Sequence, residues 1–347
     1  QAEYEESKTI NLKAEVVDIA GNKTVINVGS DKLTIDTVIP TISRVESINP
    51  GDGSANNGLF GIDNVINIKF TFSESLTLTD GVATVGLDVI TAPEIAAADL
   101  QGVDNITIAY TVQENDESLK LAFTGLTLPT GNLRDNAGNN MAVFTADTDF
   151  SLEDISSVEV DGVYPVAFDA GAVITKTSNT DDVIADHWDP VTAGYWNSYN
   201  DGISITIPIV ENVNTGGTVK IIGFSTDHLF WEDFTTADYV ITDADAIAGS
   251  VVIDISEADF TGTLPDSPTS WYSEGATVSL SAIITDLAGN SKQGNISLTT
   301  ITIDESAPTI ANYVVSEAIA TGGNIVANYW NSTNTGLDVS VTVQAVD

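Results

Sequence analysis

The chain of 347 residues contains no cysteine, so neither disulfide bonds nor thiolate metal sites can stabilise it. It has two histidines, His187 and His228, and neither sits beside a serine in the context of a nucleophile elbow. Phosphate-cradling glycine loops, basic stripes and zinc-ligand spacings are also missing. Among 50 acidic residues a pair of catalytic carboxylates stays possible, but we expect a protein that is not an enzyme.

Basic residues are scarce. Lysine and arginine together number 11 against 50 acidic residues, which gives a formal net charge of −39. Such a surface repels nucleic acid and anionic lipid, attracts cations, and destabilises itself unless counter-ions or divalent cations screen it. We therefore expect a salty or calcium-containing exterior and no nucleic-acid partner.

Long apolar runs are absent as well. No stretch approaches the roughly 20 apolar residues of a membrane helix, and the N-terminus lacks the basic and apolar segments of a signal peptide. We expect no direct membrane insertion in this segment. Hydrophobic residues still make up 42% of the chain and recur in an ordered pattern, which predicts folded domains and not a solvated tail.

What the sequence does contain is a repeat. Residues 4–41 recur as residues 272–309 at a constant offset of 268, and a third copy of their Asp-x-Ala-Gly-Asn signature lies at Asp135–Asn139. A second marker, Tyr195–Gly202, returns as Tyr329–Gly336. These periods predict four segments: the C-terminal part of a domain (1–38), a complete domain (39–155), a larger complete domain (156–306) and the N-terminal part of another (307–347).

Strict alternation of apolar and polar residues predicts half-buried β-strands. It is clearest in Ile66–Phe72, Ile106–Val112, Ile203–Ile209, Val278–Ile284 and Leu337–Val343. Helical periodicity is missing, and Pro93–Leu100 supports at most a short helical turn. Because Pro208 has no amide donor, its strand should lie at a sheet edge or carry a bulge there. The pattern predicts an all-β protein of serial antiparallel β-sandwiches.

Proline-containing connectors separate the predicted domains: Asp36–Pro40, Asp304–Pro308 and, as a longer equivalent, Glu153–Pro165. Because proline fixes φ and restrains the residue before it, these connectors should be stiff, and the tandem domains should form an elongated rod.

The signature turn is followed fourteen residues later by an Asp or Glu and then by a Pro-Thr start. This arrangement resembles the bacterial immunoglobulin-like repeats of large prokaryotic surface proteins, among them secreted adhesins and surface-layer proteins. Asn67–Glu74 and Leu133–Asn139 resemble the modules of surface-layer proteins in particular. The resemblance implies tandem immunoglobulin-like sandwiches over nearly the whole chain.

Two sets of acidic residues are candidate metal ligands. Asp18, Asp135 and Asp286 begin the signature, where Asp and Asn cap local amides and Gly takes a positive φ, so they either shape a turn or bind metal directly. The resemblance implies calcium at domain junctions, a position that the connector acids match: Asp36, Asp154, Asp304 and Glu305. The alternative is that these acids are solvated linker residues.

One feature of the larger copy departs from the repeat. Asp181, Asp182, Asp186, His187 and Asp189 form either a cation site or, as we expect, an exposed acidic loop. Trp196 and Trp330 occupy equivalent repeat positions and should pack in a core or at a domain end.

The leading functional hypothesis is an extracellular structural protein of a prokaryotic cell surface, such as a surface layer. Its partners would be neighbouring copies or other surface components, together with divalent cations. Two alternatives remain: the stalk of a large calcium-dependent adhesin, and a non-catalytic accessory region of a secreted carbohydrate-active enzyme. A separate possibility is that residues 1–36 of one molecule and 309–347 of another complete each other head to tail.

Overall fold

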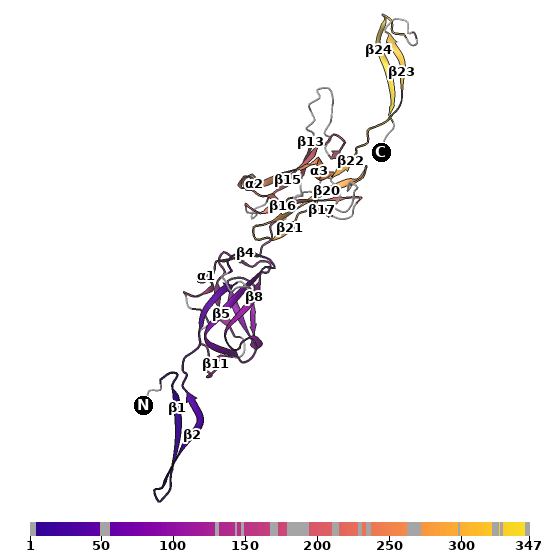
Figure 1. Ribbon diagram of the computed structural model, residues 1–347. Coiled ribbons are helices and arrows are strands. Elements are labelled where there is room, and N and C mark those ends of the chain that lie inside the picture. Colours follow the sequence, from indigo (N-terminus) through magenta and orange to yellow (C-terminus); the bar gives the residue numbers. More distant parts are fainter. Residues whose placement is uncertain are drawn as a thin grey trace. The chain divides into compact units, whose positions relative to one another are not determined.

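The computed structural model divides into two compact units (Figure 1). Unit 1 comprises Gln1–Tyr164 with Leu287–Asn290, and unit 2 comprises Pro165–Asp286 with Ser291–Asp347. The residues described are 5–48, 56–128, 132–142, 144–146, 149–166, 173–178, 194–209, 215–227, 231–233, 237–261, 272–297, 299–320, 326 and 329–343. Strands dominate both units, so the predicted all-β fold is confirmed.

The main sheet of unit 1 is organised around one long strand, β5 (Val65–Leu78). Its partners are β3 (Ile42–Ile48), β8 (Gln101–Thr111) and β11 (Leu133–Asp135), all antiparallel to it. Every second residue of β5 faces inward, as the alternation predicted for Ile66–Phe72. The pairing with β8 shifts register between Thr71 and Leu76 and again between Leu76 and Thr77, so β5 is irregular in the segment that follows Thr71.

A second sheet covers the inner face of the first. It consists of β10 (Phe123–Thr127), β6 (Val82–Leu87) and β7 (Glu94–Ala96), and it is followed by the short η1 (Ala97–Asp99), the helical turn predicted there. Phe70 of β5 meets Phe123 of β10 edge to face, with ring centroids 5.3 Å apart. Residues from both sheets form one hydrophobic core, which makes this part of unit 1 a β-sandwich.

Smaller elements complete unit 1. The strands β4 (Gly58–Gly61), β12 (Val158–Asp161) and β9 (Glu117–Ser118) form a three-stranded sheet in which β12 runs parallel to β4. The helix α1 (Leu152–Ile155) precedes β12. The first two strands, β1 (Thr9–Val17) and β2 (Lys23–Thr34), pair with each other as an antiparallel hairpin.

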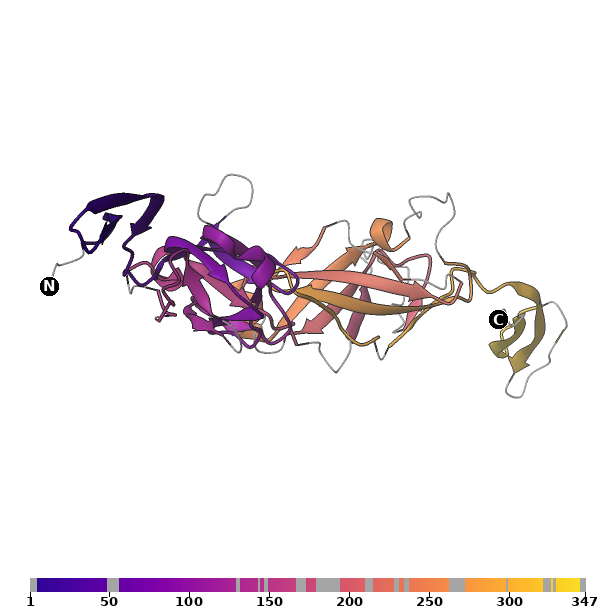
Figure 2. The ribbon, with the colours of Figure 1, turned by 90° about the horizontal axis from the view of Figure 1, so that it is seen from below.

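Unit 2 has the same two-sheet construction. One sheet contains β13 (Val173–Ser178), β15 (Gly202–Pro208) and β19 (Ser250–Ser256). The other contains β14 (Tyr195–Trp196), β16 (Thr218–Ser225), β17 (Trp231–Asp233), β18 (Tyr239–Val240), β20 (Thr277–Thr285), β21 (Ser291–Gln293) and β22 (Ile301–Ile303). Figure 2 shows strands of this unit, coloured salmon to orange, running alongside one another. Inward-facing residues of both sheets share one core.

Two short helices and a hairpin accompany these sheets. The helices are α2 (Asp243–Ala248), which begins with a capping box at Thr242, and α3 (Glu257–Phe260). The hairpin consists of β23 (Ile310–Ala320) and β24 (Asn334–Val343). No helix among the described residues is both long and apolar enough to cross a membrane.

The prediction for Pro208 was wrong. The strand β15 lies between β13 and β19 and pairs with β19 without a register shift, so it is neither an edge strand nor bulged at that point. Pro208 is the last residue of β15 and pairs with Ser250, whereas the described pairing with β13 stops at Thr206. The missing amide is therefore placed where the strand has one described neighbour instead of two.

The two equivalent tryptophans behave differently. Trp196 is 1% exposed and packs on Phe260 with ring centroids 4.5 Å apart, as predicted for a core residue. Trp330 is 62% exposed, so the prediction was wrong for this position. In the described part of its copy, β23 and β24 pair only with each other, and no second sheet covers the tryptophan.

Candidate functional site: an acidic cluster beside the signature turn

The signature turn in unit 1 is built around the carboxylate of Asp135, the last residue of β11. Its Oδ1 accepts hydrogen bonds from the backbone amides of Ala137, Gly138 and Asn139 at 2.6–2.8 Å. Its Oδ2 accepts a bond from the side-chain amide of Asn139 at 2.7 Å. Gly138 has a φ of 98°, a conformation that glycine adopts without strain. The sequence thus folds this loop by local side-chain capping.

The first copy has the same turn, and the third copy shares its positive-φ glycine. Asp18 Oδ1 accepts from the amides of Ala20 and Asn22, and Asp18 Oδ2 accepts from the Asn22 side chain at 2.8 Å. In the third copy Gly289 has a φ of 89°, and Asp286 is buried. Asp18 and Asp135 therefore act as turn residues, because their carboxylate oxygens accept hydrogen bonds from backbone amides.

The connector that leads into β3 runs alongside this turn. The backbone carbonyl of Asp36 accepts a hydrogen bond from the Asn139 side chain at 3.2 Å. Further along, Thr41 exchanges two bonds with Ser73 of β5: Ser73 N donates to Thr41 O, and Thr41 N donates to Ser73 Oγ. These bonds bring the connector against the irregular part of β5, where Glu74 follows Ser73.

As a result, the carboxylates of Asp36, Glu74 and Asp135 converge. One oxygen from each lies within 4.8 Å of the other two. Asp135 is 5% exposed, while Asp36 and Glu74 are half-buried. Within the described part of the chain, no other group of three potential ligand side chains lies this close. The structure thus joins one connector acid and one signature acid, both predicted as ligands, with Glu74, which was not predicted.

The electrostatics of the cluster are unfavourable without a counter-charge. Burial raises the pKa of Glu74 above its ordinary value, and the neighbouring carboxylates of Asp135, Asp36 and Glu6 raise it further. Burial also raises the pKa of Asp135, but hydrogen bonds from Asn139, Gly138 and Ala137 more than offset this and leave it lowered. The hydrogen bonds therefore stabilise the ionised form of Asp135. Burial and the neighbouring negative charges destabilise the ionised form of Glu74.

The donor set fits a hard divalent cation. All three groups offer carboxylate oxygens, which calcium and magnesium prefer, and they add up to three negative charges around one point. Calcium takes about six to eight oxygen ligands, so backbone carbonyls or water would complete the shell. Asp135 Oδ1 already accepts three amides, which leaves Oδ2 as its more available ligand atom.

A fourth acid, Glu6, borders the cluster. Its Oε2 accepts from both the amide and the hydroxyl of Thr37, and these bonds lower its pKa. In the repeat 268 residues later, Glu274 corresponds to Glu6 and Glu305 to Thr37. The equivalent hydrogen bond is present there: the backbone amide of Glu305 donates to the Glu274 carboxylate at 2.9 Å. Both copies therefore hold the residue after the connector aspartate in the same way.

The remaining predicted ligands are not members of this group of three carboxylates. Asp154 is exposed in α1, and Asp304 is exposed after β22. Glu305 accepts a hydrogen bond from the indole nitrogen of Trp196 at 3.1 Å. The acidic loop at Asp181–Asp189 lies outside the described residues, as do both histidines.

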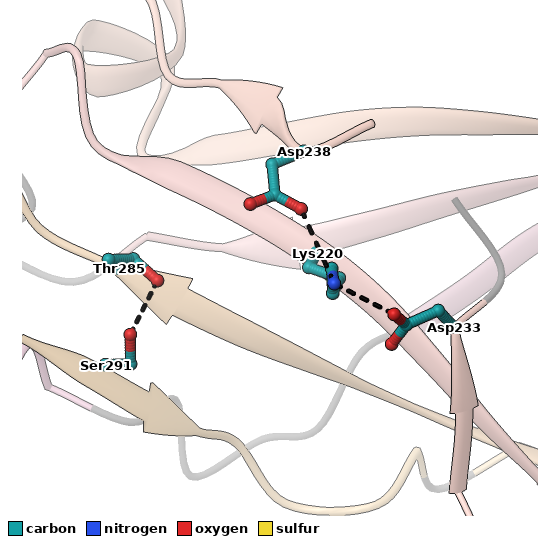
Figure 3. A network of polar contacts seen from close by, with 5 residues as sticks. All are labelled: Lys220, Asp233, Asp238, Thr285 and Ser291. Atoms are coloured by element: carbon teal, nitrogen blue, oxygen red, sulfur yellow. Dashed lines mark hydrogen bonds and ion pairs between the residues drawn. The ribbon is translucent and has the colours of Figure 1, made fainter. Parts of the chain in front are cut away.

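Lysine appears in unit 2 as part of an exposed polar network and not at the cluster. Figure 3 shows Lys220 of β16 between Asp233 of β17 and Asp238, with Nζ 2.9 Å from Asp233 Oδ2 and 4.0 Å from Asp238 Oδ1. The Asp233 carboxylate raises the pKa of Lys220. Exposed pairs of this kind contribute little stability, so this network is a surface feature of the sheet.

Glu74 could have been recognised from its place in the alternation. It continues the inward series Ile66, Ile68, Phe70 and Phe72, which then resumes with Leu76 and Leu78. An acid at an inward position of an otherwise apolar series is unusual, because burying a carboxylate without compensation is costly. The alternation alone does not identify the neighbours of Glu74, because Asp36 lies on the connector and Asp135 on β11.

No protein-family model matches the chain, and no curated protein matches it. Among solved structures, the chain is similar to the FN1–FN3 domains of chicken CNTN1, with 6% sequence identity and a TM-score of 0.29. That match covers 84% of this chain and 77% of the other.

Proposed function

We propose that this chain is a non-catalytic structural segment of an extracellular, prokaryotic cell-surface assembly built from tandem immunoglobulin-like domains and stabilised by divalent cations. The observation that carries the proposal is the convergence of Asp36, Glu74 and Asp135. Two of these residues come from features that recur along the chain, the connector and the signature turn. The described residues bring the two motifs together with Glu74 once, where a bound cation would fix the connector against the domain that follows it.

The proposed role of the cluster is to secure the connector against β5 and β11. Asp36 contributes from the connector, Glu74 from the irregular part of β5, and Asp135 from the end of β11. Bound calcium would supply the positive charge that offsets the repulsion among these carboxylates. The three side chains would then hold together segments that are far apart in the sequence.

The charge of the chain supports the same setting. A net charge of −39 favours an environment rich in salt or divalent cations, as outside the cell. It also disfavours nucleic acid and anionic lipid as partners. Neighbouring copies or other surface components, bridged or screened by cations, are the partners that fit.

Calcium-dependent melting tests the proposal. At fixed ionic strength, calcium at about ten times its dissociation constant should stabilise unit 1 by about 1.4 kcal/mol, or roughly 3–6 °C in melting temperature. Glu74→Gln should lose this gain, whereas Glu159→Gln, at an exposed position of β12, should keep it. Identical melting curves in calcium and in chelator would refute a cation role.

Assembly separates the proposed function from its alternatives. Purified chain that forms ordered sheets on addition of calcium supports a surface-layer role. Chain that binds calcium but stays monomeric at high concentration favours an adhesin stalk instead. Hydrolysis of a polysaccharide by the chain would contradict a non-catalytic role and favour an enzyme.

A further inference from the structure

The signature asparagine makes a contact that the turn itself does not require. In the first copy the Asn22 side chain bonds Asp18 Oδ2 at 2.8 Å, and the turn is fully formed on an exposed hairpin. In the second copy Asn139 keeps the equivalent bond to Asp135 and also donates to the backbone carbonyl of Asp36. The amide therefore has a second use beyond closing its own loop.

The third copy extends this second use. Asn290, in the Leu287–Asn290 segment of unit 1, donates its side-chain amide to the carbonyls of Asp161 at 2.8 Å and Val163 at 3.2 Å. Its Oδ1 accepts the backbone amide of Ile62 at 2.7 Å. Asn290 is 4% exposed, so these bonds are shielded from water. One side chain thus links the backbone after β12 to the backbone after β4.

The surrounding backbone leaves room for this side chain only because residue 61 is a glycine. A Cβ at Gly61 would lie 2.6 Å from Asn290 Oδ1 and would also overlap the carbonyl oxygen of Ala288. Contacts this short force a shift of the neighbouring atoms. The hydrogen bonds of Asn290 therefore require that the backbone at Gly61 carries no side chain.

We propose that the signature asparagine is a backbone clamp: its carboxamide fixes the connecting segment beside the turn, independently of any cation. Asparagine suits this role because one planar group both donates to carbonyls and accepts from an amide. An aspartate at the same place would accept from Ile62 but would face the Asp161 carbonyl without a proton to donate. The signature aspartate folds the turn, and the asparagine uses the folded turn to hold the connector.

Amide hydrogen exchange at Ile62 tests the clamp directly in the intact chain. Asn290→Ala removes the acceptor of this amide, so its exchange should accelerate at least tenfold, while the buried amide of Ile68 in β5 keeps its protection. Gly61→Ala should cause the same acceleration by displacing the side chain. Asn22→Ala, in the copy on the β1–β2 hairpin, should leave Ile62 unchanged.

The cation is separated from the clamp by repeating the exchange in chelator. The proposal expects Ile62 of the natural sequence to remain protected there, even if calcium dependence of melting proves absent. Loss of protection in chelator would show that a metal ion, not the asparagine, orders this backbone and would overturn the proposal. Unchanged Ile62 exchange in Asn290→Ala, with Ile68 still protected, would overturn it as well.

Discussion

Glu74 and Asp135 face each other where β5 meets β11, with carboxylate oxygens within 4.8 Å. Asp135 pairs with Leu76, two residues beyond Glu74, so the meeting is fixed by strand register. The pKa values of the two acids are shifted in opposite directions. Four hydrogen bonds stabilise the Asp135 anion, whereas burial and neighbouring charge disfavour the Glu74 anion.

Glu74→Gln is expected to stabilise unit 1 in chelator by about 0.5–1 kcal/mol, because it removes a half-buried charge from an acidic surrounding. Urea unfolding at neutral pH without divalent cations measures this change. If the variant were instead less stable than the natural sequence in chelator, the Glu74 carboxylate would make a net favourable interaction. That result would contradict the claim that the three carboxylates repel one another.

The pH dependence of the same variant gives an independent measurement. Since the folded-state pKa of Glu74 lies above its ordinary value of 4.5, folding favours the protonated acid, and the wild type loses stability as pH rises from about 4.5 through the raised value. The advantage of Glu74→Gln in chelator should therefore be small below pH 4.5 and reach a plateau at neutral pH. An advantage independent of pH would exclude the charge as its cause.

Asp135 should show the opposite dependence. Its folded-state pKa lies below the ordinary 3.8, so its contribution is complete above that pH and disappears as pH falls through the lowered value. Asp135→Ala should cost about 2 kcal/mol at neutral pH, because four donors lose their acceptor, and less at low pH. Asp18→Ala, on the exposed hairpin, is the matched control and should cost less.

Replacing the two tryptophans of the repeated marker should change stability by very different amounts. Trp196→Ala should destabilise unit 2 by about 3–5 kcal/mol, because the indole fills the core against Phe260 and donates to Glu305. Trp330→Ala should change stability by less than about 0.5 kcal/mol, as expected for an exposed side chain. Thermal unfolding followed by far-UV circular dichroism distinguishes these outcomes, and equal effects would contradict the assigned burial.

The alternation of apolar residues was sufficient to predict the main strands. Ile66–Phe72 and Ile203–Ile209 lie in β5 and β15 because inward positions of a half-buried strand must be apolar. Strand order was not predictable in this way, and Pro208 shows why: its position at the end of β15 depends on where the neighbouring strand stops.

The candidate site was predictable only in part. Asp36 and Asp135 stand out in the sequence because their motifs recur, but each motif was interpreted separately. Their convergence on Glu74 depends on the register of β11 with β5 and on the bonds between Thr41 and Ser73. These are tertiary relationships, which a local pattern does not encode. The exposure of Trp330 likewise depends on which strands surround it.

A crystal of the chain grown with calcium and then exchanged with terbium tests the central claim most directly, because terbium replaces calcium at oxygen sites and scatters anomalously. The account predicts an anomalous peak bounded by Asp36, Glu74 and Asp135, which disappears in Glu74→Gln and persists in Glu159→Gln. Peaks found only elsewhere on the chain, with these three carboxylates unliganded, would contradict it.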